Sequence, residues 1–160
     1  MAHMSKHFFM RPITIVLAVR EEAPRKACLR ILQSQKWVKV VAEATSGLDA
    51  FAAVAQLKPS VLLLDMNLSH EKGASLIPAL HRKCPDSKVI VLVGRPVETP
   101  ILDALSCGAM GYLEEKEIPE FLTKAIQAMD AGEAWVPRTM VAKIIAQLAR
   151  LPGPKNYVRT

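Results

Sequence analysis

The sequence predicts an α/β protein in which a parallel sheet is covered by helices on both faces. Short apolar runs alternate five times with longer segments whose apolar residues recur at helical spacing. Of the 160 residues, 51% are hydrophobic, which is enough for a sizeable core. A regular alternation of strands and helices is typical of parallel sheets, because each helix carries the chain back to start the next strand.

The five predicted strands are short, apolar and rich in β-branched residues. Runs of this kind are typical of strands buried on both faces of a parallel sheet. The third run, VLLLD, ends on Asp65, so a buried strand leads directly into a carboxylate. The predicted strands cover residues 13–19, 38–44, 61–65, 88–94 and 111–114.

Six segments have the apolar spacing of helices, and most carry a start or stop signal. Ser46 is a predicted N-cap, and Pro119 falls in a first helical turn. Pro78 requires either a kink or a position in the first turn. Gly108 and Gly132 are predicted helix stops. The predicted helices cover residues 24–35, 46–57, 74–83, 99–108, 118–132 and 138–150.

This element order predicts a flavodoxin-like doubly wound (βα)5 fold with strand order 2-1-3-4-5, plus an extra C-terminal helix. In that order the first and third strands are neighbours at the topological switch point. Ligands of such folds bind outside the carboxyl ends of these strands. We therefore expect Asp65 and the segment VREEAP, residues 19–24, to meet there.

Composition and charge argue against several function classes. The net charge is +6, but much of the excess lies at the two ends, which argues against a basic nucleic-acid-binding face on the folded part. No apolar run approaches the roughly 20 residues of a membrane span. Cys28, Cys84 and Cys107 are scattered, which indicates reduced thiols of a cytoplasmic protein and no metal site. The sequence shows no nucleophile–base pair and no cofactor-binding loop that would indicate an enzyme.

Several motifs in a fixed order resemble a known family. They are VVAEATSGLDAF, PSVLLLDMNL with Gly73 eight residues after Asp65, VIVLVG, LSCGAMGYLEE and AIQAMDAGEAWVP. Together they resemble the CheY-like receiver domains of response regulators of the NarL/LuxR type, which are transcription factors. The resemblance implies that Asp65 is the phosphoacceptor position, served by a histidine kinase, and that a helix-turn-helix DNA-binding domain lies beyond this chain.

The residues at the two ends and the resemblance together suggest a division of the chain. We expect a cloning remnant and N-terminal tail at residues 1–11, a receiver domain at 12–135, a linker helix at 136–150 and a flexible tail at 151–160.

The groups that hold Mg²⁺ in this family are replaced. Phosphoryl transfer to a carboxylate needs a metal ion, held by carboxylates, to neutralise charge. The family's acidic pair follows the first strand, where this chain has Val19 and Arg20, and neither can bind Mg²⁺. Glu21 and Glu22 are the fallback ligands, one or two positions later. We expect no cofactor and no metal unless one of these glutamates reaches the site.

Other switch positions are also degenerate. The hydroxyl position at the end of the fourth strand is Val93, and the lysine position after the fifth strand is Glu115. The proline usually found four residues after the acceptor is Ser69. Asp65 and the switch-type aromatic Tyr112 remain. We therefore expect an atypical receiver, or pseudo-receiver, that is not efficiently phosphorylated.

Without phosphorylation, Asp65 has two alternative roles. It could cap the turn after its strand through an Asx-type hydrogen bond, or it could pair with a cation of the same chain. Arg20 is the predicted partner, because a guanidinium can hold a carboxylate with two parallel hydrogen bonds, and Lys116 is the fallback. We expect a direct contact between Arg20 and Asp65 at about 3 Å.

The expected function is regulatory contact with other proteins, homodimerisation above all, and not catalysis. Leu29, Phe121, Ile126 and Met129 are candidates for either the dimer interface or the core, which helical phase does not separate. The final helix could dock on its own domain, or form a dimer interface or a connector to a DNA-binding domain.

Two alternative functions stay open. One is a phosphorylation-switched receiver that uses Asp65 with Glu21 or Glu22 for Mg²⁺. The other is an atypical receiver that senses a small ligand above the first and third strands.

Overall fold

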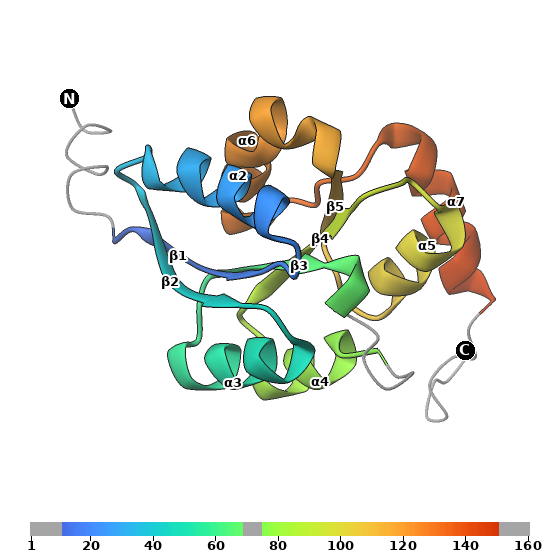
Figure 1. The fold of residues 1–160 in the computed structure, drawn as a ribbon. Coiled ribbons are helices and arrows are strands. Elements are labelled where there is room, and N and C mark those ends of the chain that lie inside the picture. The colour runs from blue at the N-terminus through green and yellow to red at the C-terminus, as the bar shows by residue number, and fades with distance from the viewer. Residues whose placement is uncertain (1–10, 69–74, 151–160) are drawn as a thin grey trace, which may run out of the picture.

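A single parallel β-sheet forms the centre of the protein (Figure 1). The structure is a computed structural model that describes residues 11–68 and 75–150. The strand order is β2-β1-β3-β4-β5, as the sequence predicts, and all neighbouring strands are parallel. The strands are β1 (Ile13–Ala18), β2 (Val38–Ala44), β3 (Val61–Asp65), β4 (Lys88–Val93) and β5 (Gly111–Glu114).

Two helices, α3 (Gly47–Leu57) and α6 (Ile118–Asp130), begin where their sequence signals place them. Ser46 accepts a hydrogen bond from the amide of Asp49 at 3.1 Å, so the predicted N-cap is confirmed. Pro119 lies in the first turn of its helix. The helices are α2 (Glu22–Gln33), α3 (Gly47–Leu57), α4 (Ile77–Lys83), α5 (Glu98–Ser106), α6 (Ile118–Asp130) and α7 (Arg138–Ala149).

Helix α4 is shorter than predicted. It begins at Ile77 instead of residue 74, with Pro78 in its first turn. Proline has no N–H, so it cannot donate the helical hydrogen bond to the residue four positions earlier. The first such bond runs from the amide of Leu80 to the carbonyl of Leu76, at 3.0 Å. Of the two positions open to Pro78, the first turn is therefore the one adopted.

The sheet separates two hydrophobic cores. Helices α2 and α6 cover one face, and α3, α4 and α5 cover the other (Figure 1). Ile126 and Met129 are fully buried between α6 and the sheet, so they belong to the core and not to a dimer interface. Leu29 and Phe121 are half-buried at the rim of the same core.

After α6, the chain crosses the outer edge of the sheet. We call residues 133–137 the strap. The amide of Trp135 donates to the carbonyl of Met110 at 3.0 Å, and the amide of Tyr112 donates to the carbonyl of Trp135 at 3.2 Å. The strap therefore runs beside β5 as a short parallel extension of the sheet.

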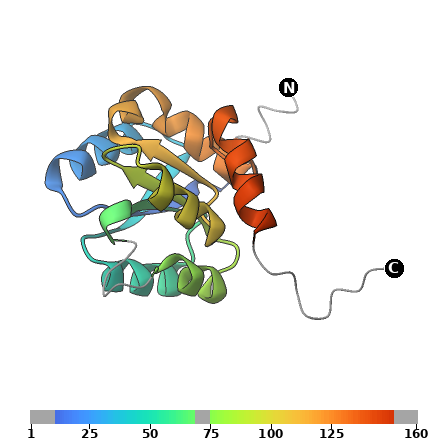
Figure 2. The ribbon, with the colours of Figure 1, turned by 90° about the vertical axis from the view of Figure 1, so that its right-hand side faces the viewer.

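The final helix, α7, lies against α5 (Figure 2). Its Met140 is buried, and Ile144 packs against the core under α5. Lys143 Nζ lies 2.6 Å from Glu98 Oε2. Helix α7 thus docks on its own domain, and its roles as a dimer interface or a connector stay predictions.

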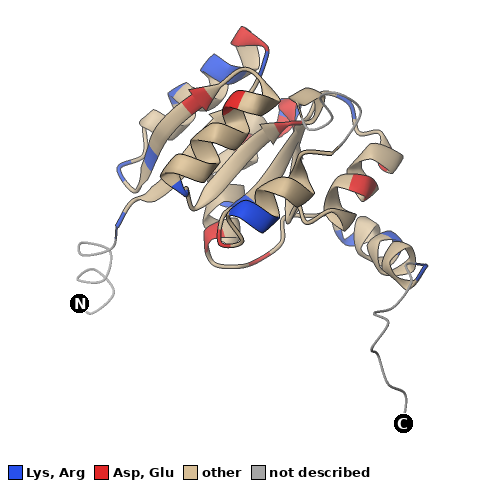
Figure 3. Ribbon diagram, turned by 90° about the horizontal axis from the view of Figure 1, so that it is seen from below, with Lys and Arg blue, Asp and Glu red and all other residues tan. Residues whose placement is uncertain are grey.

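Charge is spread over the described surface. In the view of Figure 3, Lys and Arg residues are interspersed with Asp and Glu residues along helices and loops. No described helix has the length and apolar character needed to cross a membrane.

Candidate functional site

Asp65 ends β3 at the point where the sheet order reverses, between β1 and β4. Its side chain is only 8% exposed. Oδ2 accepts a hydrogen bond from the main-chain N–H of Arg20 at 3.2 Å, and Oδ1 accepts one from the N–H of Asn67 at 3.0 Å. The bond to Asn67, two residues along the chain, has the Asx pattern that the sequence analysis considered. The carboxylate is thus held on both oxygens by main-chain amides.

Arg20 meets Asp65 through its main chain. It directly follows Val19 at the end of β1, and its N–H points at the carboxylate. The contact has about the predicted length, but its donor is the amide and not the guanidinium. The pairing of the guanidinium with Asp65, and the fallback pairing with Lys116, stay predictions.

Arg25 fixes the loop that presents this amide. Its Nη1 donates to the carbonyl of Val19 at 3.1 Å and to the carbonyl of Arg20 at 3.0 Å. Its Nε lies 3.6 Å from Glu43 Oε1 on β2. The sequence analysis missed Arg25, although an arginine in the first helical turn after a strand is well placed to cap the loop between them.

The positions of the family's acidic pair do not offer metal ligands. The side chain of Val19 is fully buried in the core under α2 and α6. Glu21 is exposed at the N-cap of α2, and Glu22 pairs with Lys26 at 2.5 Å. Within residues 11–68 and 75–150, no three His, Cys, Asp or Glu side chains group closely enough to hold a metal ion. The described residues thus do not fit the Mg²⁺ site of a receiver.

Glu115 places a negative charge where the family has a lysine. It begins a short 3-10 turn after β5, Glu115–Glu117. A Cβ atom added to Gly94, at the end of β4, would lie 3.1 Å from Glu115 Oε2, so the carboxylate lies over that glycine.

Burial raises the pKa of the Cys28 thiol to about 12, and the Glu115 carboxylate adds to the rise.

The hydroxyl position, Val93, and the switch-type aromatic, Tyr112, lie in or near the core. Val93 is 3% exposed and packs under α5. Tyr112 on β5 is half-buried and packs against the same core. Burial raises the pKa of Tyr112, and the carboxylates of Glu114 and Glu117 raise it further. Ser69 and Gly73 lie outside the described residues.

A cavity of about 260 Å³ opens beside Asp65, between the ends of β3 and β4 and the start of α5. Its lining combines apolar residues, among them Val97 and Ile101, with the polar residues Asn67 and Arg95. Arg95 is a cation near the acceptor position that the sequence analysis missed. No local pattern identifies it, because only the fold brings the β4–α5 loop next to β3.

A five-stranded doubly wound sheet with a buried aspartate at its switch point matches the CheY-like receiver fold. The model of the response regulator receiver domain family matches residues 16–127. The chain belongs to this family. Among solved structures, the response regulator domain of Thermotoga maritima CheB is similar, with 26% identity, a TM-score of 0.64, and coverage of 75% of this chain and 98% of that one.

Similar curated proteins are named as regulators. The transcriptional regulatory protein YxjL of Bacillus subtilis is 30% identical over 138 residues, which cover 86% of this chain and 63% of YxjL. The nitrate/nitrite response regulator protein NarL of Escherichia coli is 28% identical over 137 residues, which cover 86% of this chain and 63% of NarL. This chain thus spans less than two thirds of the length of either relative.

Proposed function

We propose that this chain is the receiver domain of a NarL/LuxR-type transcriptional regulator that acts through protein contacts and is not efficiently phosphorylated. The family membership and the names of its relatives support the first part. One observation carries the second part. Asp65 is bound by main-chain amides, while Val19, Val93 and Glu115 occupy the positions that would supply the metal ligand, the hydroxyl and the lysine.

The physical reason is charge. A phosphoryl group adds about −1.5 to −2 charges at neutral pH and needs cations to offset them. The Glu115 carboxylate lies over Gly94, near the end of β3, and adds a further negative charge. Without a metal ion and a lysine, the phosphorylated aspartate would be strongly destabilised.

The partners follow from the family. A helix-turn-helix domain in the remainder of the regulator would bind DNA, and the protein would work in the cytoplasm as a homodimer. A histidine kinase is a partner only if the phosphorylation-switched alternative holds.

Amide NMR of the whole chain tests the proposal. We expect no shift of the Arg20, Asn67 and Asp65 amides when Mg²⁺ and then beryllofluoride are added. The quadruple variant Val19→Asp, Arg20→Asp, Val93→Thr, Glu115→Lys is the positive control, because it restores the family's groups. Shifts in the wild type that disappear in Asp65→Asn would contradict the proposal and support the phosphorylation-switched alternative.

The cavity beside Asp65 favours a second candidate function, the sensing of a small ligand. Its lining combines Asp65 and Arg95 with apolar residues, which suits a small molecule with charged groups. A screen of such molecules by thermal shift would test it, with Arg95→Gln as the variant expected to lose binding. Hits that bind Arg95→Gln equally well would argue against this cavity as the site.

A further inference from the structure

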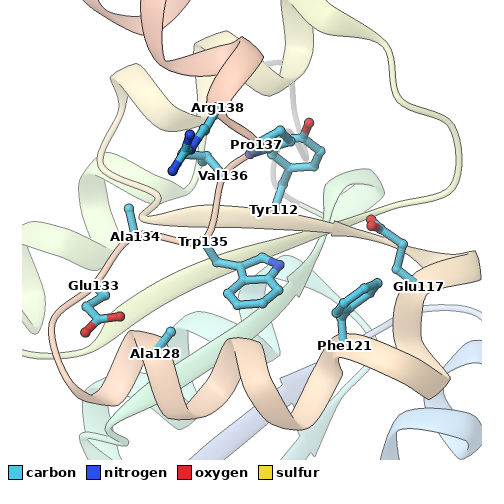
Figure 4. Close-up of a pocket in the computed structure, with 10 residues that line it drawn as sticks. All are labelled: Tyr112, Glu117, Phe121, Ala128, Glu133, Ala134, Trp135, Val136, Pro137 and Arg138. Atoms are coloured by element: carbon cyan, nitrogen blue, oxygen red, sulfur yellow. The ribbon is translucent and has the colours of Figure 1, made fainter.

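A second, larger cavity lies between β5, α6 and the strap (Figure 4). Its volume is about 760 Å³, within the range of small-molecule sites. Asp65 does not line it, so it is separate from the acceptor position. Three half-buried aromatic residues line it, Tyr112 from β5, Phe121 from α6 and Trp135 from the strap. Phe121 and Trp135 lie together on one side of β5, and the Tyr112 ring lies on the other side (Figure 4). Neither the family resemblance nor the proposed function assigns it a role.

The aromatic rings give this cavity a preference for positive charge. The faces of aromatic rings carry negative electrostatic potential and attract cations within about 6 Å. The ring centroids of Phe121 and Trp135 are 6.1 Å apart, and the planes are tilted by 47°. Lys124 Nζ already lies 5.6 Å from the centroid of Phe121, so this ring attracts a cation within the fold itself. Lys124 is not among the lining residues.

Glu117 adds a fixed carboxylate to the same cavity. Its Oε1 accepts a hydrogen bond from the amide of Glu114 at 3.0 Å, as part of a capping box. This bond holds the side chain in place and uses only one of its two oxygens. In Figure 4, Glu117 lies next to Phe121, whereas Arg138 points away from it at the other end of the strap.

The cavity is formed before any ligand binds. The strap is hydrogen-bonded to β5 at Met110 and Tyr112, and it lies so close to Gly111 that a Cβ atom there would be 2.5 Å from the Trp135 carbonyl oxygen. A site that is already ordered loses less entropy on binding. We propose that this cavity binds an organic cation, an ammonium or guanidinium group carried by a small molecule, beside the rings of Phe121 and Trp135 and the carboxylate of Glu117.

Tryptophan fluorescence tests this proposal on the full chain. The chain has two tryptophans, so Trp37→Phe leaves Trp135 as the only tryptophan, which is excited selectively over the tyrosines. Choline is the probe, and 3,3-dimethylbutan-1-ol is its neutral isostere. We expect choline to change Trp135 emission saturably and to bind roughly fivefold or more tightly than the alcohol, because the cation contributes most of the attraction.

Two variants in the Trp37→Phe background locate the site. Glu117→Gln keeps an oxygen that can accept from the Glu114 amide but removes the charge, so choline should bind roughly tenfold more weakly. Phe121→Leu should weaken it similarly, and Glu43→Gln on β2 is the distant control with unchanged binding. Agmatine serves as the guanidinium probe.

Three outcomes would overturn the proposal. They are the absence of a saturable change with choline and with agmatine, equal binding of choline and the neutral alcohol, and unchanged choline binding in Glu117→Gln. None of them depends on whether Asp65 is phosphorylated, so the proposed function and this site fail or stand separately.

Discussion

The carbonyl oxygen of Trp135 lies where only a glycine fits at position 111, because a Cβ atom there would be 2.5 Å away. This contact allows the strap to hydrogen-bond along β5, the outermost strand on that side of the sheet. An exposed strand edge invites pairing with other chains, and a covering segment prevents it. Because Gly111 has no side chain, the strap can run directly along β5 on its way to α7.

Replacing Gly111 with alanine should displace the strap. We expect the free energy of unfolding to fall by about 1–3 kcal/mol, as for other overpacked sites, and urea denaturation would measure it. Gly94→Ala is the matched control, since its Cβ would meet only the end of the flexible Glu115 side chain, at 3.1 Å. Equal losses in the two variants would contradict the proposed role of the close approach.

Helix α7 should depend on Met140 more than on its ion pair. Met140 is 9% exposed and joins the core under α5, so Met140→Ala should cost about 2 kcal/mol and speed amide exchange throughout α7. Lys143→Ala should cost at most about 1 kcal/mol, because the Lys143–Glu98 pair is half-exposed. Val141→Ala, at a residue that is 41% exposed, is the neutral control. If Lys143→Ala releases α7 and Met140→Ala does not, the ion pair holds the helix.

The Cys28 thiol should make the fold sensitive to alkaline pH. Its folded pKa is raised to about 12 by burial and by the Glu115 carboxylate, against an ordinary value of 9.0. Between these values the unfolded thiol ionises while the folded one keeps its proton, so its contribution is fully present below pH 9 and is lost as pH rises. The slope for one such group is at most about 1.4 kcal/mol per pH unit.

Urea denaturation at about pH 8 and about pH 10 would detect this contribution. Comparison with Cys28→Ala cancels the effect of other groups that titrate in the same range. We expect the wild type to lose more stability than the variant over this interval. Parallel pH profiles would show that ionisation of Cys28 does not contribute.

The fold could be predicted from the sequence because its signals are local. Each of these signals lies within one strand or helix: the apolar runs, the Ser46 cap and the first-turn prolines. The strand order was predicted from the alternation of strands and helices. Asp65 was placed at the switch point for the same reason. The start of α4 was predicted too early, because the prediction relied on the apolar spacing more than on the N–H group that Pro78 lacks.

The surroundings of Asp65 could be predicted only in part. The amides of Arg20 and Asn67 have no signature in the sequence, since every residue but proline has an N–H group. Arg95 and the strap depend on contacts between segments that are distant along the chain. The sequence suggested that Arg20 and Asp65 meet, yet it could not tell which atoms of Arg20 would make the contact.

The hydrogen bond between Arg20 and Asp65 should survive removal of the Arg20 side chain, because its donor is the main-chain N–H. In Arg20→Ala, we expect the amide proton of residue 20 to stay downfield in the NMR spectrum and slow to exchange. In Asp65→Ala, that proton and the Asn67 amide should both move upfield, and the free energy of unfolding should fall by about 1.5–3 kcal/mol, as for hydrogen bonds to charged groups. Asp65→Asn should keep the bond from Asn67 through its remaining oxygen and lose the one from Arg20, because an NH₂ group cannot accept it. If Arg20→Ala instead shifts the residue 20 amide as far as Asp65→Ala does, the guanidinium positions the carboxylate, and the side-chain pairing predicted from the sequence would be supported.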